Sequence, residues 1–417
     1  MTAQQGAQRR SDHARHYHVT ELKPPPGWTF SQANTISATG VISGLAAPTP
    51  TSTQSAVVWN HGKLAVLGTL GGINSGGFGA IEQRGEILTV GQAESADADP
   101  NDENFCFYGT HEKCLPVLWN GSTVTQLPTL GGTNGSSGPI NAKGEVAGTA
   151  ETAFRDPACP GIVAVNGTGP QVLDYKGVIW DLNRNQTRTL EPLAGDTVSI
   201  ALWINDEGEA VGISGTCANT VIPPIAYGPH SVLWDRRGIP HDLGNLGSAT
   251  ANAALSINNR GDVVGASSTT GASNAFDGSF AFLWIREQDI RSLGALPGDV
   301  ASAAQGINDK GEITGLSVDP QGNPRAVLWR QGLIADLNEL TVEDSPLSIL
   351  LDAYSTNDAG EVVGFGVTTL GDIHGFLLTP CDRSDEAWNP EMHRNRQATL
   401  PPYLRDIVRA RLGMHHQ

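Results

Sequence analysis

The chain of 417 residues carries 26 basic and 43 acidic residues, which gives a formal net charge of −17. This excess of acidic groups disfavours nucleic acid and anionic membrane surfaces as partners, so neither is expected. No run approaches the roughly 18 apolar residues that a membrane-spanning helix needs, so no transmembrane segment is expected either. The 50 glycines and 25 prolines, with only 17% charged residues, are typical of many short strands joined by tight turns.

Residues 1–16 are expected to form a disordered segment, and they contain no apolar stretch suited to a signal peptide. Residues 17–22 predict a single strand that belongs to no complete unit. One phrase then recurs, close to A-x-x-I-N-x-x-G-x-V-V-G, followed by a variable stretch and by A-x-L-W. Its first half appears seven times, within residues 34–44, 79–91, 138–148, 202–212, 255–265, 305–315 and 354–364. Self-similarity of this kind indicates a repeat architecture.

Each repeat predicts four short strands. The glycine of the phrase follows a polar turn between two apolar alternations, as in a hairpin whose turn ends in a left-handed residue. The asparagine before it can bond to the backbone two residues on and stabilise the turn. A strand ending in tryptophan and a strand ending in L-G-x-L complete the unit, which matches the blade of a β-propeller. The structural turn glycines include Gly144, Gly208, Gly261, Gly311 and Gly360.

The ends of the repeat array predict how it closes. The seventh unit stops after three strands at Thr379, and the strand at 17–22 matches the missing fourth. Pairing the two would hide exposed strand edges. We therefore expect an all-β, seven-bladed propeller over residues 17–380, closed by the N-terminal strand, and a monomer. Residues 381–417 predict a polar linker and a short amphipathic helix, with Leu404, Ile407, Val408 and Leu412 on one face.

These phrases resemble the bacterial HAF-repeat proteins, whose units contain L-G-T-L-G-G, then A-x-x-I-N-x-x-G-x-V-V-G, then A-F-L-W. Residues 17–22, 66–72, 127–132, 255–265 and 281–284 carry the resemblance, which spans about residues 17–379. The resemblance implies an extracellular propeller without an established activity. It informs the fold more than the function.

The longest variable stretches, about 92–115, 149–176 and 213–230, connect the second and third strands of units two, three and four. In a propeller these connections share one face, and variable loops on a rigid scaffold are where binding is usually found. Aromatic rings beside polar groups suit sugars or peptide segments, although the loops could instead pack on one another. The candidate ligand-binding residues are Phe105, Phe107, Tyr108, His111, Phe154, Arg155, Asp156, Tyr227 and His230.

Four of the five cysteines lie in these loops. We expect a disulfide between Cys106 and Cys114 and a second between Cys159 and Cys217, with Cys381 left over. Disulfides would indicate an oxidising compartment outside the cytoplasm, either extracellular or periplasmic. The alternative is a cytoplasmic protein with free thiols. No C-x-x-C pair or matched histidine spacing predicts zinc.

Calcium is the one cofactor that the sequence suggests. Asp97, Asp99 and Asn101 alternate as calcium ligands do in an EF-hand loop. However, Asp102 stands where that loop needs glycine, and Tyr108 stands where it needs glutamate. A solvated acidic loop is the alternative.

No nucleophile elbow, zinc-protease motif or phosphate-binding loop is present in the sequence. The leading hypothesis is a non-catalytic, extracytoplasmic propeller that presents the loops of units two to four to a glycan or a protein. Two alternatives stay open: a carbohydrate-active hydrolase or lyase with acidic residues near the central channel, and a purely structural repeat protein. The fold alone cannot decide among them.

Overall fold

The computed structural model describes residues 16–157, 159, 170–221, 226–269, 278–342, 345–381 and 400–412. The first strand of the described residues is β1 (Tyr17–Leu22). Unit one contains β2 (Phe30–Ile36), β3 (Ile42–Ala47), β4 (Ser55–Asn60) and β5 (Lys63–Val66). Unit two contains β6 (Gly71–Gln83), β7 (Glu86–Ala98), β8 (Glu112–Asn120) and β9 (Thr123–Gln126). Unit three contains β10 (Gly131–Ile140), β11 (Glu145–Arg155), β12 (Leu173–Asp181) and β13 (Gln186–Leu190).

The later units follow the same order. Unit four contains β14 (Val198–Ile204), β15 (Ala210–Gly215), β16 (His230–Trp234) and β17 (Pro240–Asp242). Unit five contains β18 (Asn252–Ile257), β19 (Val263–Ser268), β20 (Ser279–Trp284) and β21 (Arg291–Ser292). Unit six contains β22 (Ala301–Ile307), β23 (Ile313–Val318), β24 (Pro324–Arg330) and β25 (Leu333–Asp336), with a 3₁₀ turn η1 (Leu337–Glu339). Unit seven contains β26 (Leu347–Thr356), β27 (Val362–Thr368) and β28 (Ile373–Pro380), and the helix α3 (Pro402–Leu412) ends the described chain.

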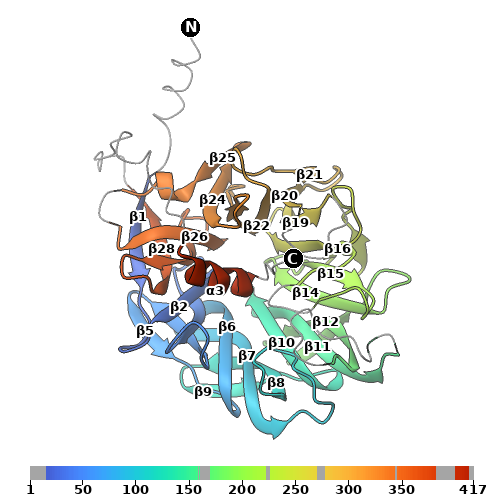
Figure 1. The fold of residues 1–417 in the computed structure, drawn as a ribbon. Coiled ribbons are helices and arrows are strands. Elements are labelled where there is room, and N and C mark those ends of the chain that lie inside the picture. Colours follow the sequence, from blue (N-terminus) through green and yellow to red (C-terminus); the bar gives the residue numbers. More distant parts are fainter. Residues whose placement is uncertain are drawn as a thin grey trace.

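The strands form repeated antiparallel sheets around a common centre, which is a β-propeller-like, all-β arrangement (Figure 1). Among the described residues, units two to six each form a separate four-stranded sheet, and units seven and one belong to one eight-stranded sheet. Within that sheet β28 and β2 are joined by a single parallel register pair, Phe30 with Ile373. The first strand of each unit lies nearest the centre (Figure 1).

The predicted pairing of the N-terminal strand with the last unit is present. β1 runs antiparallel to β28 over six residues, from Tyr17 opposite Pro380 to Leu22 opposite Gly375. Tyr17 and Leu22 are buried at the two ends of β1. Because β1 supplies the fourth strand, β28 has no open edge along these residues.

The turn between the first and second strands is held by one asparagine in five consecutive units. In unit six, the Asn308 side-chain oxygen accepts from the backbone N–H groups of Lys310 and Glu312, at 3.1 and 2.9 Å. Its amide donates to the Glu312 carboxylate at 2.8 Å and to the Asn357 backbone carbonyl of unit seven at 2.9 Å. The same pattern recurs at Asn141, Asn205, Asn258 and Asn357.

Each of these turns also needs a left-handed residue. The φ angles of the five predicted turn glycines lie between 75° and 83°. A side chain at such a φ strains the backbone, so the glycine fixes the tight turn that brings the asparagine against the next unit. The motif N-x-x-G followed by glutamate or aspartate therefore combines a local turn with a link between neighbouring units.

The tryptophans that end the third strands fill the spaces between sheets. Trp119, Trp180, Trp234 and Trp329 are at most 2% exposed. Each indole N–H donates to a backbone carbonyl in the connection that leaves the preceding unit, at 2.7 to 3.1 Å. The ring is thus buried while its polar group stays satisfied, which suits a large aromatic residue between two sheets.

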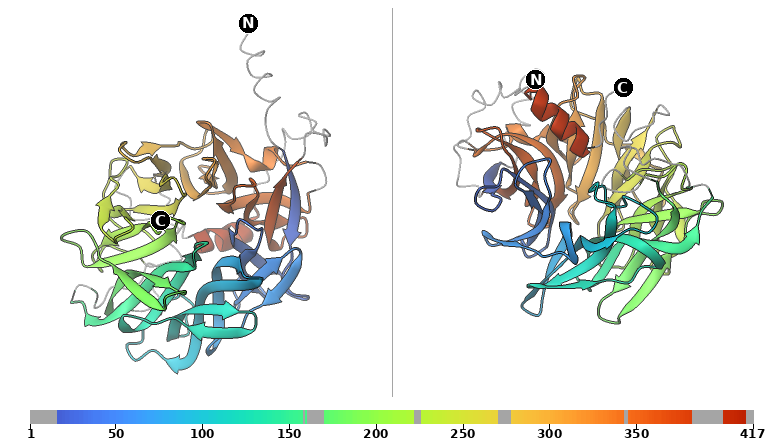
Figure 2. Two further views of the ribbon diagram at one scale, coloured as in Figure 1. Left: turned by 180° about the vertical axis from the view of Figure 1, so that it is seen from behind. Right: turned by 60° about the horizontal axis from the view of Figure 1, so that its bottom comes forward.

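The helix α3 lies at one end of the central region. Figure 1 shows it near the centre of the sheets, and the reverse view in Figure 2 shows it on the far side. Leu400, Leu404 and Val408 are buried against strand ends of units one, five, six and seven, such as Phe30 and Val318. These strand ends adjoin the connections between second and third strands, so α3 covers the end that we call the loop face. We call the opposite end, with the asparagine turns, the turn face.

We expect Asn308→Ala to lower the free energy of unfolding by about 2–4 kcal/mol, because it removes four hydrogen bonds at a buried turn. Urea unfolding followed by circular dichroism measures the change. Lys310→Ala, at an exposed position of the same turn, is the matched control and should change stability by no more than about 0.5 kcal/mol. Equal effects of the two substitutions would contradict the role of the asparagine.

Candidate functional site

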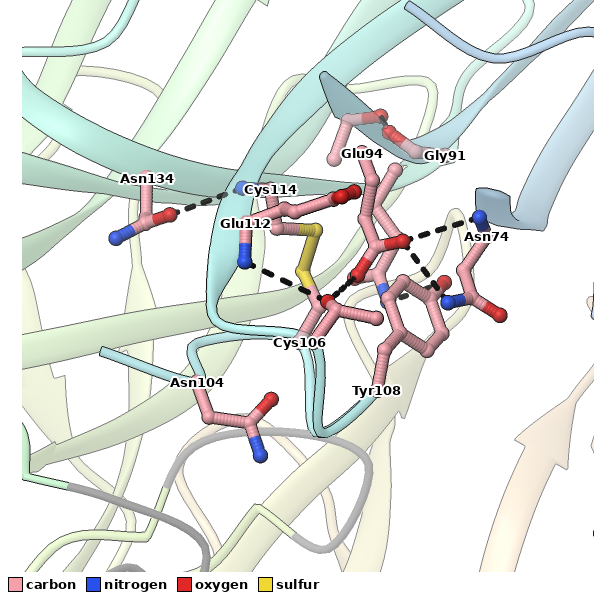
Figure 3. The surroundings of a disulfide bond; sticks show 12 residues. Asn74, Gly91, Glu94, Asn104, Cys106, Tyr108, Glu112, Cys114 and Asn134 are labelled. Atoms are coloured by element: carbon pink, nitrogen blue, oxygen red, sulfur yellow. Dashed lines mark hydrogen bonds between the residues drawn. A yellow bond between two sulfur atoms is a disulfide. The ribbon is translucent and has the colours of Figure 1, made fainter. Parts of the chain in front are cut away.

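The long connections of units two, three and four are cross-linked at the loop face. Cys106 and Cys114 form a disulfide within the unit-two connection, and Cys159 and Cys217 join the connections of units three and four. Both predicted disulfides are confirmed, and Cys381 is not in a disulfide. Figure 3 shows the first bridge, where the Cys114 N–H donates to the Asn134 side chain at 2.9 Å.

The candidate aromatic residues pack into this cross-linked layer. Phe105 is 3% exposed and Tyr227 is 7% exposed, and Phe107 and Tyr108 pack against the cluster that contains both disulfides. The Tyr108 hydroxyl accepts from the Gln92 amide at 2.9 Å, and burial raises the pKa of Tyr108 to about 12. Phe105 is thus buried in this layer, Phe107 and Tyr108 are half-buried against it, and Tyr227 packs in a separate small cluster with Ala251.

The remaining candidates are spread over the loop face. Arg155 donates to the Asn101 side chain, Asp156 accepts from Thr197, and the ring of His230 lies 3.1 Å from the Asp242 carboxylate. The ring of His111 contacts the Asp102 backbone carbonyl. Phe154, at 60% exposed, is the one large exposed ring of this candidate set. Within the part of these loops that the structure describes, the candidates are thus divided between rings in the loop packing and polar residues with separate partners.

The three suggested calcium ligands have separate partners. Asp97 pairs with Lys113 at 3.3 Å, and Asn101 accepts from Arg155. Asp99 accepts from the backbone N–H groups of Asn101 and Glu103. Among the described residues no group of three or more His, Cys, Asp or Glu side chains is placed to hold a metal ion. Calcium at these residues thus gains no support from their geometry.

Two buried glutamates connect the loops of units two and three. The Gln171 amide donates to Glu103 at 3.1 Å and to Glu151 at 2.9 Å. Glu151 also accepts from the backbone N–H groups of Thr133 and Asn134. Burial, with the charge of the neighbouring carboxylate, raises the pKa of Glu151 to about 8, and burial also raises the pKa of Glu103. The protonated form of Glu151 is therefore favoured up to about pH 8.

A cavity of about 270 Å³ lies at the opposite end of the molecule, on the turn face. All seven units contribute to its wall at equivalent positions, through the last residues of the first strand and the turn that follows. The lining stretches are 35–39, 79–82, 139–142, 203–206, 257–259, 307–309 and 355–358.

The rim of the cavity is held by hydrogen bonds between units. The residue after the turn asparagine is acidic in units four, six and seven, where it is Asp206, Asp309 and Asp358. The carboxylate of Asp206 accepts from the Ala142 N–H at 2.7 Å, and that of Asp358 accepts from the Asp309 N–H at 2.8 Å. Each of these carboxylates is thereby fixed by the backbone of the preceding unit.

One aromatic ring stands in the wall. Trp203 is half-buried and lines the cavity, and a β-bulge in β14 falls between Ala201 and Trp203. Bulges redirect side chains at the end of a strand. At the same position the other units carry small residues or proline: Thr35, Ala80, Pro139, Ser256, Gly306 and Ser355. Trp203 is thus the one aromatic residue among the described lining residues, beside the isoleucines of the wall, and part of its side chain packs against the apolar cluster of units four and five that contains Val211 and Val263.

Sequence reasoning missed this cavity, since it directed attention to the variable loops. The sequence feature that could have indicated the cavity was variation inside the repeat phrase, at the residue just before I-N and the residue just after it. The isoleucine and asparagine between them line the cavity in most units as well, and the asparagine also links neighbouring units.

No protein-family model matches the sequence, and a comparison with curated proteins finds no match. Solved structures with a similar arrangement include virginiamycin B lyase from Staphylococcus aureus, with 9% identity, a TM-score of 0.48 and coverage of 87% of this chain and 99% of that chain. A streptogramin B lyase has 8% identity, a TM-score of 0.47 and coverage of 88% and 98%. TolB from Acinetobacter baumannii has 10% identity, a TM-score of 0.38 and coverage of 70% and 63%. At this level of similarity no activity is transferred from these proteins.

We expect the double substitution Cys159→Ser with Cys217→Ser to lower the free energy of unfolding by about 2–4 kcal/mol, because it reopens a loop between two units. Chemical denaturation under non-reducing conditions gives the value. Cys381→Ser is the control and should leave stability unchanged. A double variant as stable as the parent protein would count against this bridge.

Stability should also depend on pH through Glu151. Its pKa is about 8 in the folded protein against 4.5 for an ordinary glutamate, so between these values the folded state holds more protons than the unfolded chain. Stability therefore falls as pH rises from about 4.5 to 8 and levels off above. We expect Glu151→Gln to flatten this decline and to be more stable than the parent protein at pH 8. Urea unfolding across pH 4 to 9 measures both profiles, with exposed Glu287→Gln as the control; parallel profiles for Glu151→Gln and the parent would refute the assignment.

Proposed function

We propose that the chain is a seven-bladed β-propeller that binds a glycan without catalysing its conversion. The blade count is supported by the strand order. Units two to six are separate four-stranded sheets, and the eight-stranded sheet divides at the single parallel pair between β28 and β2. On that division, β26, β27, β28 and β1 form the seventh blade, and the N-terminal strand closes the ring.

We also propose that the protein works in an extracytoplasmic, oxidising compartment. The two disulfides support this location, because such bonds persist where thiols are not kept reduced. None of the helices that the structure describes is long and apolar enough to cross a membrane.

The observation that carries the proposed binding role is the turn-face cavity. Its volume of about 270 Å³ is near the lower end of ligand pockets, which suits about one or two sugar rings. Trp203 offers an aromatic face to the apolar C–H groups of a sugar, while carboxylate and amide oxygens around it can accept hydrogen bonds from hydroxyl groups. The loop face offers fewer aromatic surfaces for a ligand, because most of its candidate rings pack within the loops.

The arrangement of the rim favours binding over catalysis. Asp206, Asp309 and Asp358 each accept a backbone hydrogen bond, so these carboxylates have a common structural environment. Paired catalytic carboxylates have environments that push their pKa values apart. A protein ligand of the exposed loops remains the second candidate, favoured only by the exposure of Phe154.

The proposal is tested with a panel of mono- and disaccharides in thermal unfolding. A sugar at ten times its dissociation constant stabilises the folded state by about 1.4 kcal/mol, so the melting temperature rises. We expect Trp203→Ser, which copies the residue of units five and seven, to abolish that rise while preserving the fold. A rise that persists in Trp203→Ser would place binding elsewhere, and no rise with any sugar would contradict glycan binding.

A further inference from the structure

The side chains that line the turn-face cavity carry acidic groups and no basic ones, and the nearby Arg260 donates to the Asp309 backbone carbonyl. Glu82, Asp206, Asp309 and Asp358 contribute four carboxylates to it. The lining residues include no lysine, arginine or histidine. The protein as a whole carries a formal charge of −17, which adds to the negative potential at the rim. Sugars with phosphate, sulfate or carboxylate groups are therefore disfavoured here.

The carboxylates of units six and seven are fixed before any ligand arrives. The Asp309 carboxylate accepts from the Asn259 backbone N–H at 2.7 Å and from its side-chain amide at 3.0 Å. The Asp358 carboxylate accepts from the Asp309 N–H at 2.8 Å. Because these side chains are already ordered, binding a positive group to them requires little further loss of conformational freedom.

The acidic groups are not spread evenly around the cavity. At the position after the turn asparagine, units four, six and seven have aspartate, while units one and three have Ala38 and Ala142. Trp203 belongs to unit four, the unit that also contributes Asp206 to the cavity. A ring next to carboxylates can hold a cation by the combination of cation–π attraction and charge.

We propose that this cavity selects amino sugars, which are sugars that carry a free, protonated amino group; the proposal rests on glycan binding at the turn face. The sugar ring packs against Trp203, and its ammonium group lies toward the carboxylates of Asp206 and Asp309. N-acetylation removes the positive charge and adds bulk, so the acetylated form of the same sugar binds more weakly. The chemistry of the rim thus adds a charge requirement to the shape requirement.

A matched pair of ligands tests the charge requirement. Isothermal titration of the full-length protein compares the β-1,4-linked disaccharide of glucosamine with its N,N′-diacetylated form at neutral pH. We expect the free amine to bind about tenfold more tightly at low salt, a preference worth about 1.4 kcal/mol, and the preference to shrink as salt rises. Raising the pH above the pKa of the amine should remove the preference for the free-amine form.

The chain itself supplies conservative variants. Asn259 occupies in unit five the position that aspartate has in units four, six and seven, so Asp206→Asn and Asp309→Asn copy a residue that this rim already accommodates. In each variant the side-chain oxygen can still accept the backbone N–H, while the charge and the second carboxylate oxygen, which accepts from the Asn259 amide, are lost. We expect each to reduce the preference for the free amine about threefold or more, with the acetylated sugar little affected. Asp372→Asn, between β27 and β28 at the loop face, is the control and should leave both affinities unchanged.

Each outcome bears on the proposal separately from glycan binding in general. Equal affinity for the two forms, abolished in Trp203→Ser, would retain the glycan site and overturn the charge requirement. An amine preference that survives in both aspartate variants would overturn the assigned carboxylates. Failure of both disaccharides to bind, while a neutral sugar binds through Trp203, would overturn the amino-sugar proposal alone. Failure of every sugar would overturn the proposed function as well.

Discussion

The asparagine at the first turn of units three to seven is the contact on which the rest of the structure depends. Its amide donates to the backbone carbonyl of the next unit in an unbroken series from Asn141 through Asn205, Asn258 and Asn308 to Asn357, which donates to Ser37 of unit one. Each carboxamide is fully used, because its oxygen also accepts two backbone N–H groups of its own turn. The series therefore fixes the local turn and the spacing between units at once.

This inter-unit contact explains why the two faces differ. The turn face must keep one geometry in every unit, so its loops are short, and the ring of turns leaves a cavity at its centre. The loop face carries no such constraint and has accepted insertions in units two to four, which are then stabilised by two disulfides. Insertions without their own sheet need such cross-links, since a long loop gains little from the repeat core.

The sequence specifies the scaffold well for a physical reason. Three features of each unit are local requirements: the period-two alternation, the glycine at the tight turn and the buried tryptophan. Because each feature recurs in several units, an erroneous strand assignment in one unit is recognised by comparison with the others. The pairing of β1 with β28 follows from the missing fourth strand of the last unit. The disulfides could be predicted because the cysteines fell in neighbouring loops of a repeat whose order was already known.

The candidate site was harder to predict from the sequence. Its residues come from all the units and meet only when the units are arranged around a common centre. Phe105 and Tyr227 have the composition of a binding surface, but composition does not distinguish a ring that faces solvent from one that closes a loop. Trp203 could not be found by searching the variable loops, because it lies near the end of a strand inside the repeat phrase.

In a repeat protein the constant residues form the scaffold. The scaffold then places the variable residues next to them around one central axis. Asp206, Asn259, Asp309 and Asp358 show this directly: the backbone bond at this position is kept in units four to seven, and charge is what changes between aspartate and asparagine. Specificity can therefore vary at this rim without altering the contact that holds the units together.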